Sequence, residues 1–313
     1  MKTPRFSVIV PSYNRARFLP EMIESVRAQN SSSVEIVVID DGSTDNTAEI
    51  CARHPDLVTY RYQENMGISA ARNAAIRLAR GELISFLDSD DMFLPGKFAM
   101  EEDAFARFPE AEVVSADSEK WLEGKLVCPS WFQERGVPEI KEPQFLSEHD
   151  TVWVDTKICG TSAMTARREV FEKVGLFDLR FHRNEDLELW YRIATQCRVL
   201  LLPGTFSRVR RFDDGSRVGR PVPGATQSTI EAYQRMLWHY RAVEVSIAGK
   251  KLLRPVAERF ERLRGNLVRG IVQHAPATEN REVLRLASSE ARRGALGDAL
   301  FLFGSWLRRG ICG

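Results

Sequence analysis

The chain of 313 residues lacks the features of several protein classes. Its five cysteines are scattered, odd in number and include no CxxC pair, which argues against a disulfide framework or a zinc site and for a reducing compartment. Lys and Arg together number 44 and Asp and Glu 43, so the net charge is only +1. Because a balanced charge creates no general attraction for polyanions, no nucleic-acid partner is expected.

Signals for membranes and for dinucleotide binding are also missing. No window holds about 18 uninterrupted apolar residues, so no membrane span is expected. The N-terminus runs into the strand "FSVIV" without an apolar signal segment, which predicts a cytoplasmic protein. The turn "PSYNRA" after this strand has no GxGxxG pattern, which disfavours a dinucleotide-dependent oxidoreductase. It also has no Gly- and Arg/Lys-rich phosphate loop, which disfavours a nucleotidyltransferase.

The first half of the chain alternates between strand and helix patterns. Unbroken apolar runs predict strands at 6–10, 34–40, 57–62, 82–87 and 111–116, and amphipathic stretches predict helices at 17–29, 43–54, 69–80 and about 95–108. This order predicts an α/β fold with a mostly parallel sheet covered on both faces. Ligands of such sheets bind beyond the carboxyl ends of the strands, which brings three loops to one edge: 11–15, 40–45 and 88–91.

The alternation stops after about residue 117. The sequence predicts a hairpin at 121–129, a loop at 130–150, a strand and short helix within 160–178, a helix at 184–196 and strands at 198–203 and 206–212. Residues 213–224 are rich in Gly and Pro, and an amphipathic helical pattern follows from 226 to the end. We therefore predict a domain over 1–224, with halves 1–117 and 118–224, and a helical region over 225–313.

The most unusual motif is "LDSDD", in which three carboxylates follow a buried strand. Asp88, Asp90 and Asp91 would repel one another and are costly to desolvate. Mg²⁺ and Mn²⁺ take oxygen ligands and are often held by one or two carboxylates together with substrate phosphates. Asp and Ser are also good turn formers, so the motif taken alone favours a charged turn, with a divalent-cation site as the alternative.

Three further motifs carry polar side chains at expected strand or helix ends. Asp40 and Asp41 end a strand, and Ser43 or Thr44 is interpreted as the cap of the next helix. Arg72 lies in the first turn of a helix, where it could meet a phosphate or an aspartate, or only solvent. Glu185 and Asp186 begin another helix, where they complement its dipole or supply a general base.

Taken in order, "PSYNR", "VIDDGSTDNT", "ENMGISAARN", "FLDSDD", "GTSAMTARREVFEKVGLFD" and "NEDLELWYR" resemble the motifs of family 2 glycosyltransferases over roughly residues 5–220. The resemblance implies a GT-A fold, a nucleotide-sugar donor, a Mn²⁺ or Mg²⁺ ion and inversion at the anomeric carbon. It also implies a donor that is a UDP-sugar by family expectation, with dTDP and GDP left open.

The resemblance implies a role for each matched residue. Asp186 corresponds to the catalytic base, with Glu185 as its partner, and Asp88 and Asp90 to the metal-binding pair, with Asp91 nearby. The donor-nucleotide site would comprise Pro11, Ser12, Tyr13, Arg15, Asp40, Asp41, Arg72 and Ser89, with Asp41 accepting a hydrogen bond from the base. Arg211 and Arg217 could contact the diphosphate from a flexible loop or could simply be solvated; many relatives carry a His in this loop, where this chain has Phe212 and Asp213.

The acceptor is expected to be a hydroxyl of a glycan or a lipid-linked molecule. The segment 299–313 combines aromatic residues with Arg308 and Arg309, which could rest on the inner face of the plasma membrane, pack on the core or form a homodimer. An alternative function is a non-catalytic nucleotide-sugar-binding protein that acts in assembly.

Overall fold

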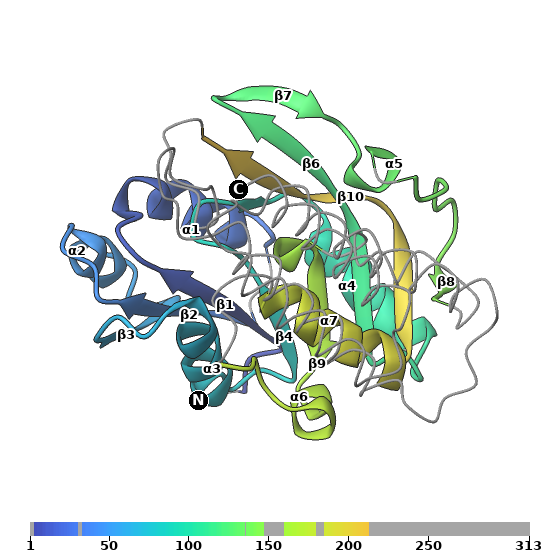
Figure 1. The fold of residues 1–313 in the computed structure, drawn as a ribbon, viewed down its shortest axis with the longest axis horizontal. Helices are drawn as coiled ribbons and strands as arrows, with labels where there is room; N and C mark the ends of the chain where they lie inside the picture. Colours follow the sequence, from blue (N-terminus) through green and yellow to red (C-terminus); the bar gives the residue numbers. More distant parts are fainter. Residues whose placement is uncertain (1–2, 31–32, 135, 147–159, 180–184, 213–313) are drawn as a thin grey trace, which may run out of the picture. The chain divides into compact units, whose positions relative to one another are not determined.

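A computed structural model describes five stretches of the chain, residues 3–30, 33–134, 136–146, 160–179 and 185–212 (Figure 1). By its internal contacts the chain divides into two units, 1–219 and 220–313, and every described residue belongs to the first. The helical pattern expected from 226 onward lies outside the described residues. The domain boundary expected after residue 224 stays a prediction.

The first half of the chain forms four neighbouring parallel strands in the order β3-β2-β1-β4. They are β1 (Phe6–Ser12), β2 (Val34–Asp41), β3 (Val58–Gln63) and β4 (Leu83–Phe86). Successive side chains face opposite sides of the sheet, so Val8 and Val10 of β1 join one buried cluster and Ile9 joins the other. Apolar side chains on both faces of β1 suit a sheet that is covered on both faces, as the sequence predicted.

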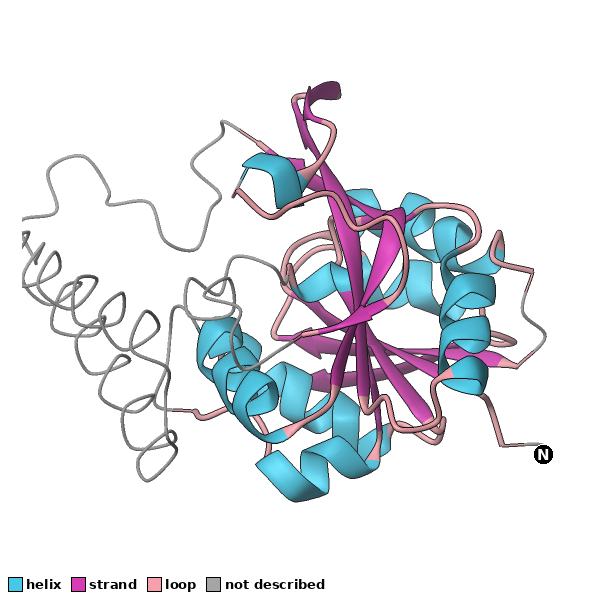
Figure 2. Cartoon of the chain, turned by 90° about the vertical axis from the view of Figure 1, so that its right-hand side faces the viewer, coloured by secondary structure: helices cyan, strands magenta, loops and turns pink. Residues whose placement is uncertain are grey.

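Helices cover both faces of this sheet (Figure 2). One apolar cluster receives side chains from α3 (Ile68–Leu78), α6 (Glu169–Val174) and α7 (Glu185–Gln196). The other receives them from α1 (Leu19–Arg27), α2 (Thr47–Ala52) and α4 (Lys97–Arg107). Short helical turns occur at η1 (Ala16–Phe18), α5 (Trp131–Glu134) and η3 (Thr161–Ala163).

The second half of the chain extends the sheet with strands of mixed direction. Strand β9 (Met164–Arg167) lies antiparallel between β4 and β6 (Val113–Leu122), and β10 (Val199–Arg211) lies parallel to β6. The short strands β5 (Met92–Phe93), β7 (Lys125–Cys128) and β8 (Gln144–Phe145) complete a ten-stranded sheet. Strands β6 and β7 form the hairpin expected near 121–129.

Strand β10 corrects one expectation, because a single strand replaces the two that the sequence predicted. The backbone passes through Pro203 and Gly204, where the first predicted strand ends, as a bulge. The pairing with β6 shifts register between Leu201 and Thr205 and again between Thr205 and Ser207. Gly204 has a φ of 93°, a conformation that favours glycine, so this bulge tolerates the pair without ending the strand.

A second correction concerns helix α2, which begins at Thr47 rather than at residue 43. Ser43 and Thr44 do not cap it. Instead the Asp45 Oδ1 atom accepts hydrogen bonds from the backbone N and Oγ1 of Thr47, at 3.1 and 2.6 Å. The backbone N of Ser43 donates to Asp40 Oδ1 at 2.8 Å, so the segment before the helix folds back on the end of β2.

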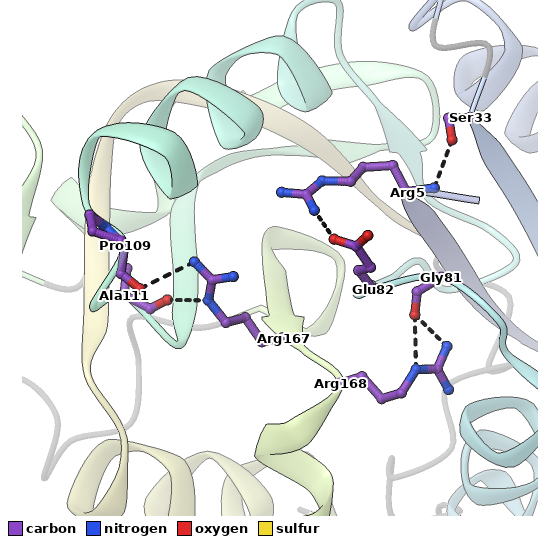
Figure 3. A network of polar contacts seen from close by, with 8 residues as sticks. All are labelled: Arg5, Ser33, Gly81, Glu82, Pro109, Ala111, Arg167 and Arg168. Atoms are coloured by element: carbon purple, nitrogen blue, oxygen red, sulfur yellow. Dashed lines mark hydrogen bonds and ion pairs between the residues drawn. The ribbon is translucent and has the colours of Figure 1, made fainter. Parts of the chain in front are cut away.

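Arginine side chains fasten the edge of the sheet where the parallel strands begin (Figure 3). Arg168 Nε donates to the carbonyl oxygen of Gly81 at 2.9 Å, and Arg167 Nε donates to that of Ala111 at 2.8 Å. A Cβ atom on Gly81 would lie 2.6 Å from the backbone N of Ser7, so only glycine fits there. These contacts hold the last residues of the antiparallel β9 at the end of the sheet opposite the carboxyl ends of β1, β2 and β4.

Candidate functional site

The loops that follow β1 and β2 are joined by hydrogen bonds at the carboxyl edge of the sheet. The backbone N of Asn14 donates to Ser43 Oγ at 2.9 Å, and the backbone N of Thr44 donates to Asn14 Oδ1 at 2.8 Å. The backbone N of Ala16 donates to Asp45 Oδ2 at 2.9 Å. Two of the three loops that the sequence placed at one edge are therefore in direct contact.

Asp41 is buried at the end of β2 and organises the loop that leads into α3. Its Oδ1 atom accepts hydrogen bonds from Gln63 Nε2 at 2.7 Å and from the backbone N of Met66 at 2.9 Å, and its Oδ2 atom accepts one from the backbone N of Gly67 at 2.8 Å. A carboxylate offers about four acceptor positions, so these three bonds leave room for one further donor.

The residues expected to line a nucleoside pocket surround the ends of β1 and β2. Pro11 and Ser12 are buried in β1, where Ser12 pairs in register with Asp40. Asp40 accepts a hydrogen bond from the Tyr60 hydroxyl at 2.8 Å. Ser12 Oγ is buried and has no hydrogen-bond partner within the described residues. The side chain of Tyr13 is about half exposed, so this edge offers an aromatic surface beside polar groups.

The acidic loop after β4 exposes two of its three carboxylates. The side chains of Asp88 and Asp90 are 32% and 23% exposed, whereas Ser89 and Asp91 are buried. Arg15 Nε lies 3.6 Å from Asp90 Oδ2, which links this third loop to the loop after β1. Burial and the charge of Asp88 raise the pKa of Asp90 above its ordinary value, although Arg15 opposes them. The loop thus concentrates negative charge that a cation would relieve.

Asp91 connects the acidic loop to two other segments of the fold. Its Oδ2 atom accepts a hydrogen bond from Ser162 Oγ at 2.6 Å, and its Oδ1 atom accepts one from the backbone N of Arg210 at 2.9 Å. Burial and the charges of Asp90 and Asp88 raise the pKa of Asp91 well above its ordinary value. Both oxygens are therefore engaged by the protein, and the part of Asp91 in metal binding stays a prediction.

Arg72 connects the acidic loop to the start of α7. Its side chain is 2% exposed, its NH2 donates to Asp88 Oδ1 at 2.8 Å and its NH1 donates to Glu185 Oε1 at 2.7 Å. Asp186, which follows Glu185, is partly exposed and lies 3.4 Å from the Thr161 hydroxyl that donates to its Oδ2. Through Arg72, the structure therefore brings Asp88, which is predicted to bind the metal, close to Glu185 and the predicted general base Asp186.

The expected phosphate contacts after β10 are described only in part. Arg211 NH1 donates to the carbonyl oxygen of Arg210 at 3.0 Å, and its positive charge opposes the rise in the pKa values of Asp90 and Asp91. The ring of Phe212 stacks on Phe18 with centroids 4.7 Å apart. Arg217 lies outside the described residues.

Three residues of this region make contacts that the sequence motifs do not reveal. Ser162 and Arg210 both contact Asp91, and the Asn73 side chain forms two hydrogen bonds with the backbone of Phe177, at 2.8 and 2.9 Å. Asn73 was visible beside Arg72 in the motif "AARN". Nothing in the sequence marks its partner, which is 104 residues away.

Two negative findings apply to the described part of the chain. It contains no group of three or more His, Cys, Asp or Glu side chains arranged to hold a metal ion. It also contains no helix that is long and apolar enough to cross a membrane. Mg²⁺ is usually bound by one or two carboxylates together with water and substrate phosphates, and such a site does not require three protein ligands.

Sequence comparisons place this arrangement among known proteins. Residues 7–175 match the description "Glycosyl transferase family 2". An uncharacterized glycosyltransferase of Rickettsia prowazekii is 28% identical over 193 residues, which cover 61% of this chain and 58% of the relative. An uncharacterized glycosyltransferase of Nostoc sp. is 43% identical over 97 residues, or 30% of each chain. The match thus spans less than two thirds of the length of these relatives.

Solved structures share the fold. S. aureus TarS 1–349 in complex with UDP-GlcNAc has a TM-score of 0.65 at 20% identity, and the match covers 97% of this chain and 92% of that one. The mannosyltransferase PcManGT from Pyrobaculum calidifontis, in complex with GDP-Man and Mn²⁺, has a TM-score of 0.54 at 19% identity and coverage of 99% and 88%. These likenesses confirm the GT-A architecture that the sequence predicted.

Proposed function

Because the chain belongs to glycosyl transferase family 2, we propose that it transfers a sugar from a nucleotide-diphosphate donor to a hydroxyl of a glycan or lipid-linked acceptor, with inversion at the anomeric carbon. The donor is a UDP-sugar. The observation that carries the proposal is the Arg72 bridge, which joins Asp88 of the acidic loop to Glu185, the neighbour of Asp186. A cation site and a base belong together in such a reaction.

The donor would lie across the carboxyl edge of the sheet. Asp41 has room for one more hydrogen-bond donor, which the N3–H group of uracil supplies. Tyr13, which follows Ser12 at the end of β1, offers a half-exposed ring for stacking. Thymine carries the same N3–H group, so the choice of UDP over dTDP rests on the family resemblance. The UDP-GlcNAc in the TarS complex agrees with a uridine donor, and the GDP-Man in the PcManGT complex marks the alternative.

The diphosphate would lie near the acidic loop. Asp88 and Asp90 would hold a Mn²⁺ or Mg²⁺ ion, which neutralises the diphosphate and makes it a better leaving group. The residues fit this ion, because both side chains are partly exposed carboxylates and because burial, together with the charge of Asp88, raises the pKa of Asp90. Arg15 and Arg211 are close enough to this loop to affect its charge, and they would bind the phosphate oxygens.

Asp186 would act as the general base. It would accept the proton of the acceptor hydroxyl while the oxygen attacks the anomeric carbon from the face opposite the nucleotide. Glu185 would not share this task, because its carboxylate is held by Arg72. Orientation of the two substrates and stabilisation of charge would supply most of the remaining acceleration. A protein that only binds nucleotide-sugars would not need such a base.

Isothermal titration with UDP, dTDP and GDP, each with and without Mn²⁺, tests the donor site. We expect UDP to bind in a Mn²⁺-dependent manner and Asp90→Ala to lose that dependence. Asp103→Asn is the control, because Asp103 is an exposed carboxylate of α4 that pairs with Arg107 one turn along the same helix. If no nucleotide binds to the wild-type protein under any condition, the proposed donor site is wrong.

A further inference from the structure

The guanidinium of Arg72 is a buried charge held between segments that are distant in the sequence. Asp88, which accepts its first hydrogen bond, is 16 residues away, and Glu185, which accepts the second, is 113 residues away. The ring of Phe177 lies on the remaining side, with its centroid 5.3 Å from Arg72 Cζ. With 2% of its side chain exposed, Arg72 has little surface left for a bound molecule.

Electrostatics keep this bridge charged. Burial lowers the pKa of an arginine, but the charges of Asp88, Glu185 and Asp186 outweigh it and hold the pKa of Arg72 above its ordinary value. A planar guanidinium can direct separate N–H groups at two carboxylates, whereas the ammonium of a lysine acts as a compact charge at the end of a flexible chain. The bridge therefore depends on an arginine and not merely on a positive charge.

The neighbouring residue fixes the ring that covers the bridge. Asn73 Nδ2 donates to the carbonyl oxygen of Phe177 at 2.8 Å, and the backbone N of Phe177 donates to Asn73 Oδ1 at 2.9 Å. Both groups are buried, so the segment that carries the ring is tied to α3 in two directions. Arg72 and Asn73 together join α3 to the acidic loop, to the Phe177 segment and to α7.

We propose that Arg72 is a positioning residue that makes the acidic loop and the start of α7 one unit, and that it does not contact the donor nucleotide. This inference rests on the proposed function, because it concerns the same cation and base. Arg72 fixes Oδ1 of Asp88 and thereby sets how strongly Asp88 binds a cation. Glu185 binds the same guanidinium and so weakens the attraction between Arg72 and Asp88. The resemblance implied instead that Arg72 lies beside the nucleotide.

The charge-conserving variant Arg72→Lys separates geometry from charge. We expect its Mn²⁺ affinity in the presence of UDP to fall about 10- to 100-fold, as is typical when a group that orients a metal ligand is changed. Binding of UDP without Mn²⁺ should stay at the wild-type level. Arg77→Lys is the control, because Arg77 lies on the exposed side of the same helix. Titration calorimetry and Mn²⁺ electron paramagnetic resonance give both affinities.

A second variant, Glu185→Gln, tests the bridge from its other end. Without the charge of Glu185, Arg72 interacts more strongly with Asp88 and competes more strongly with the cation. The Mn²⁺ affinity should therefore fall about three- to tenfold, although residue 185 is no metal ligand. The double variant should be no worse than Arg72→Lys, because the two changes break the same bridge. A purely structural role for Arg72 predicts instead that Glu185→Gln leaves the Mn²⁺ affinity unchanged.

The results separate this inference from the proposed function. If wild-type protein binds neither UDP nor Mn²⁺, the proposed function fails and the inference fails with it. If wild type binds both and Arg72→Lys binds Mn²⁺ equally well, only the inference is wrong. The inference is also wrong if Arg72→Lys weakens metal-free UDP binding as much as Mn²⁺ binding, because that pattern indicates direct contact with the nucleotide. Glu185→Gln decides the question where Arg72→Lys does not fold.

Discussion

A buried ion pair on helix α4 offers a sharp test of how charge is accommodated in this fold. Lys97 Nζ bonds Glu101 Oε1 one turn along the helix, and the two side chains are 1% and 2% exposed. Thr165 Oγ1 of β9 lies 2.9 Å from the same carboxylate oxygen and donates to it. Glu101 Oε2 is buried with no hydrogen-bond partner in the described part of the chain, and burial raises the pKa of Glu101.

We expect Glu101→Gln to lower the free energy of unfolding by about 3 to 5 kcal/mol, because it leaves the Lys97 charge buried without a counter-charge. The double variant Lys97→Met/Glu101→Leu should come within about 1 kcal/mol of wild type or exceed it, since apolar side chains of similar size avoid the desolvation cost. Asp103→Asn is the control on the same helix. It breaks an exposed pair with Arg107 at 2.9 Å and should cost only about 0.5 kcal/mol.

Urea titration followed by both circular dichroism and tryptophan fluorescence measures these differences, provided that the two signals change together. The reasoning is refuted if Glu101→Gln costs no more than Asp103→Asn, because the pair would then be as well solvated as a surface pair. It is also refuted if the double variant is less stable than Glu101→Gln, because the charges themselves would then be stabilising.

Two further predictions concern the base and the pH dependence of stability. Asp186→Asn should keep the affinity for UDP in the presence of Mn²⁺ within about twofold of wild type. It should reduce the turnover of a UDP-sugar about 100- to 10,000-fold, measured as UDP release with an acceptor hydroxyl present. A smaller loss would show that another group takes the proton. Burial raises the pKa of Glu35, but hydrogen bonds from Ser7 and Arg80 outweigh it and hold that pKa below its ordinary value. Its stabilisation is therefore complete above the unfolded-state pKa and is lost as pH falls through the folded-state pKa, so urea titrations of wild type and Glu35→Gln should converge from about pH 6 to about pH 3; a constant difference would contradict this assignment.

The first half of the fold could be predicted because its information is local. Apolar runs at 6–10, 34–40 and 82–87 each specify a strand, and the helical segments between them force a parallel arrangement with all the carboxyl ends at one edge. Part of the site could be predicted for the same reason. Asp40 and Asp88 lie at or just after the ends of their strands, so the topology alone brings them to the same edge of the sheet.

The second half could not be predicted in the same way, because its pairings span long stretches of sequence. Strand β9 enters between β4 and β6 from more than 40 residues beyond the latter, and nothing within "MTAR" specifies that position. The same applies to side chains. Ser162 and Arg210, which contact Asp91, are 71 and 119 residues away in the sequence. The sequence therefore showed the charge of this carboxylate but could not predict its burial.

The three carboxylates of the acidic loop differ in what a cation must displace. Asp91 accepts hydrogen bonds on both oxygens and is buried, so it holds the loop in place. Asp88 gives one oxygen to Arg72 at 2.8 Å, so it is shared between the loop and α7. Asp90 faces Arg15 across 3.6 Å, a separation too long for a hydrogen bond, and is 23% exposed. A cation therefore displaces least at Asp90, and for this reason Asp90 is the variant whose titration decides the donor site.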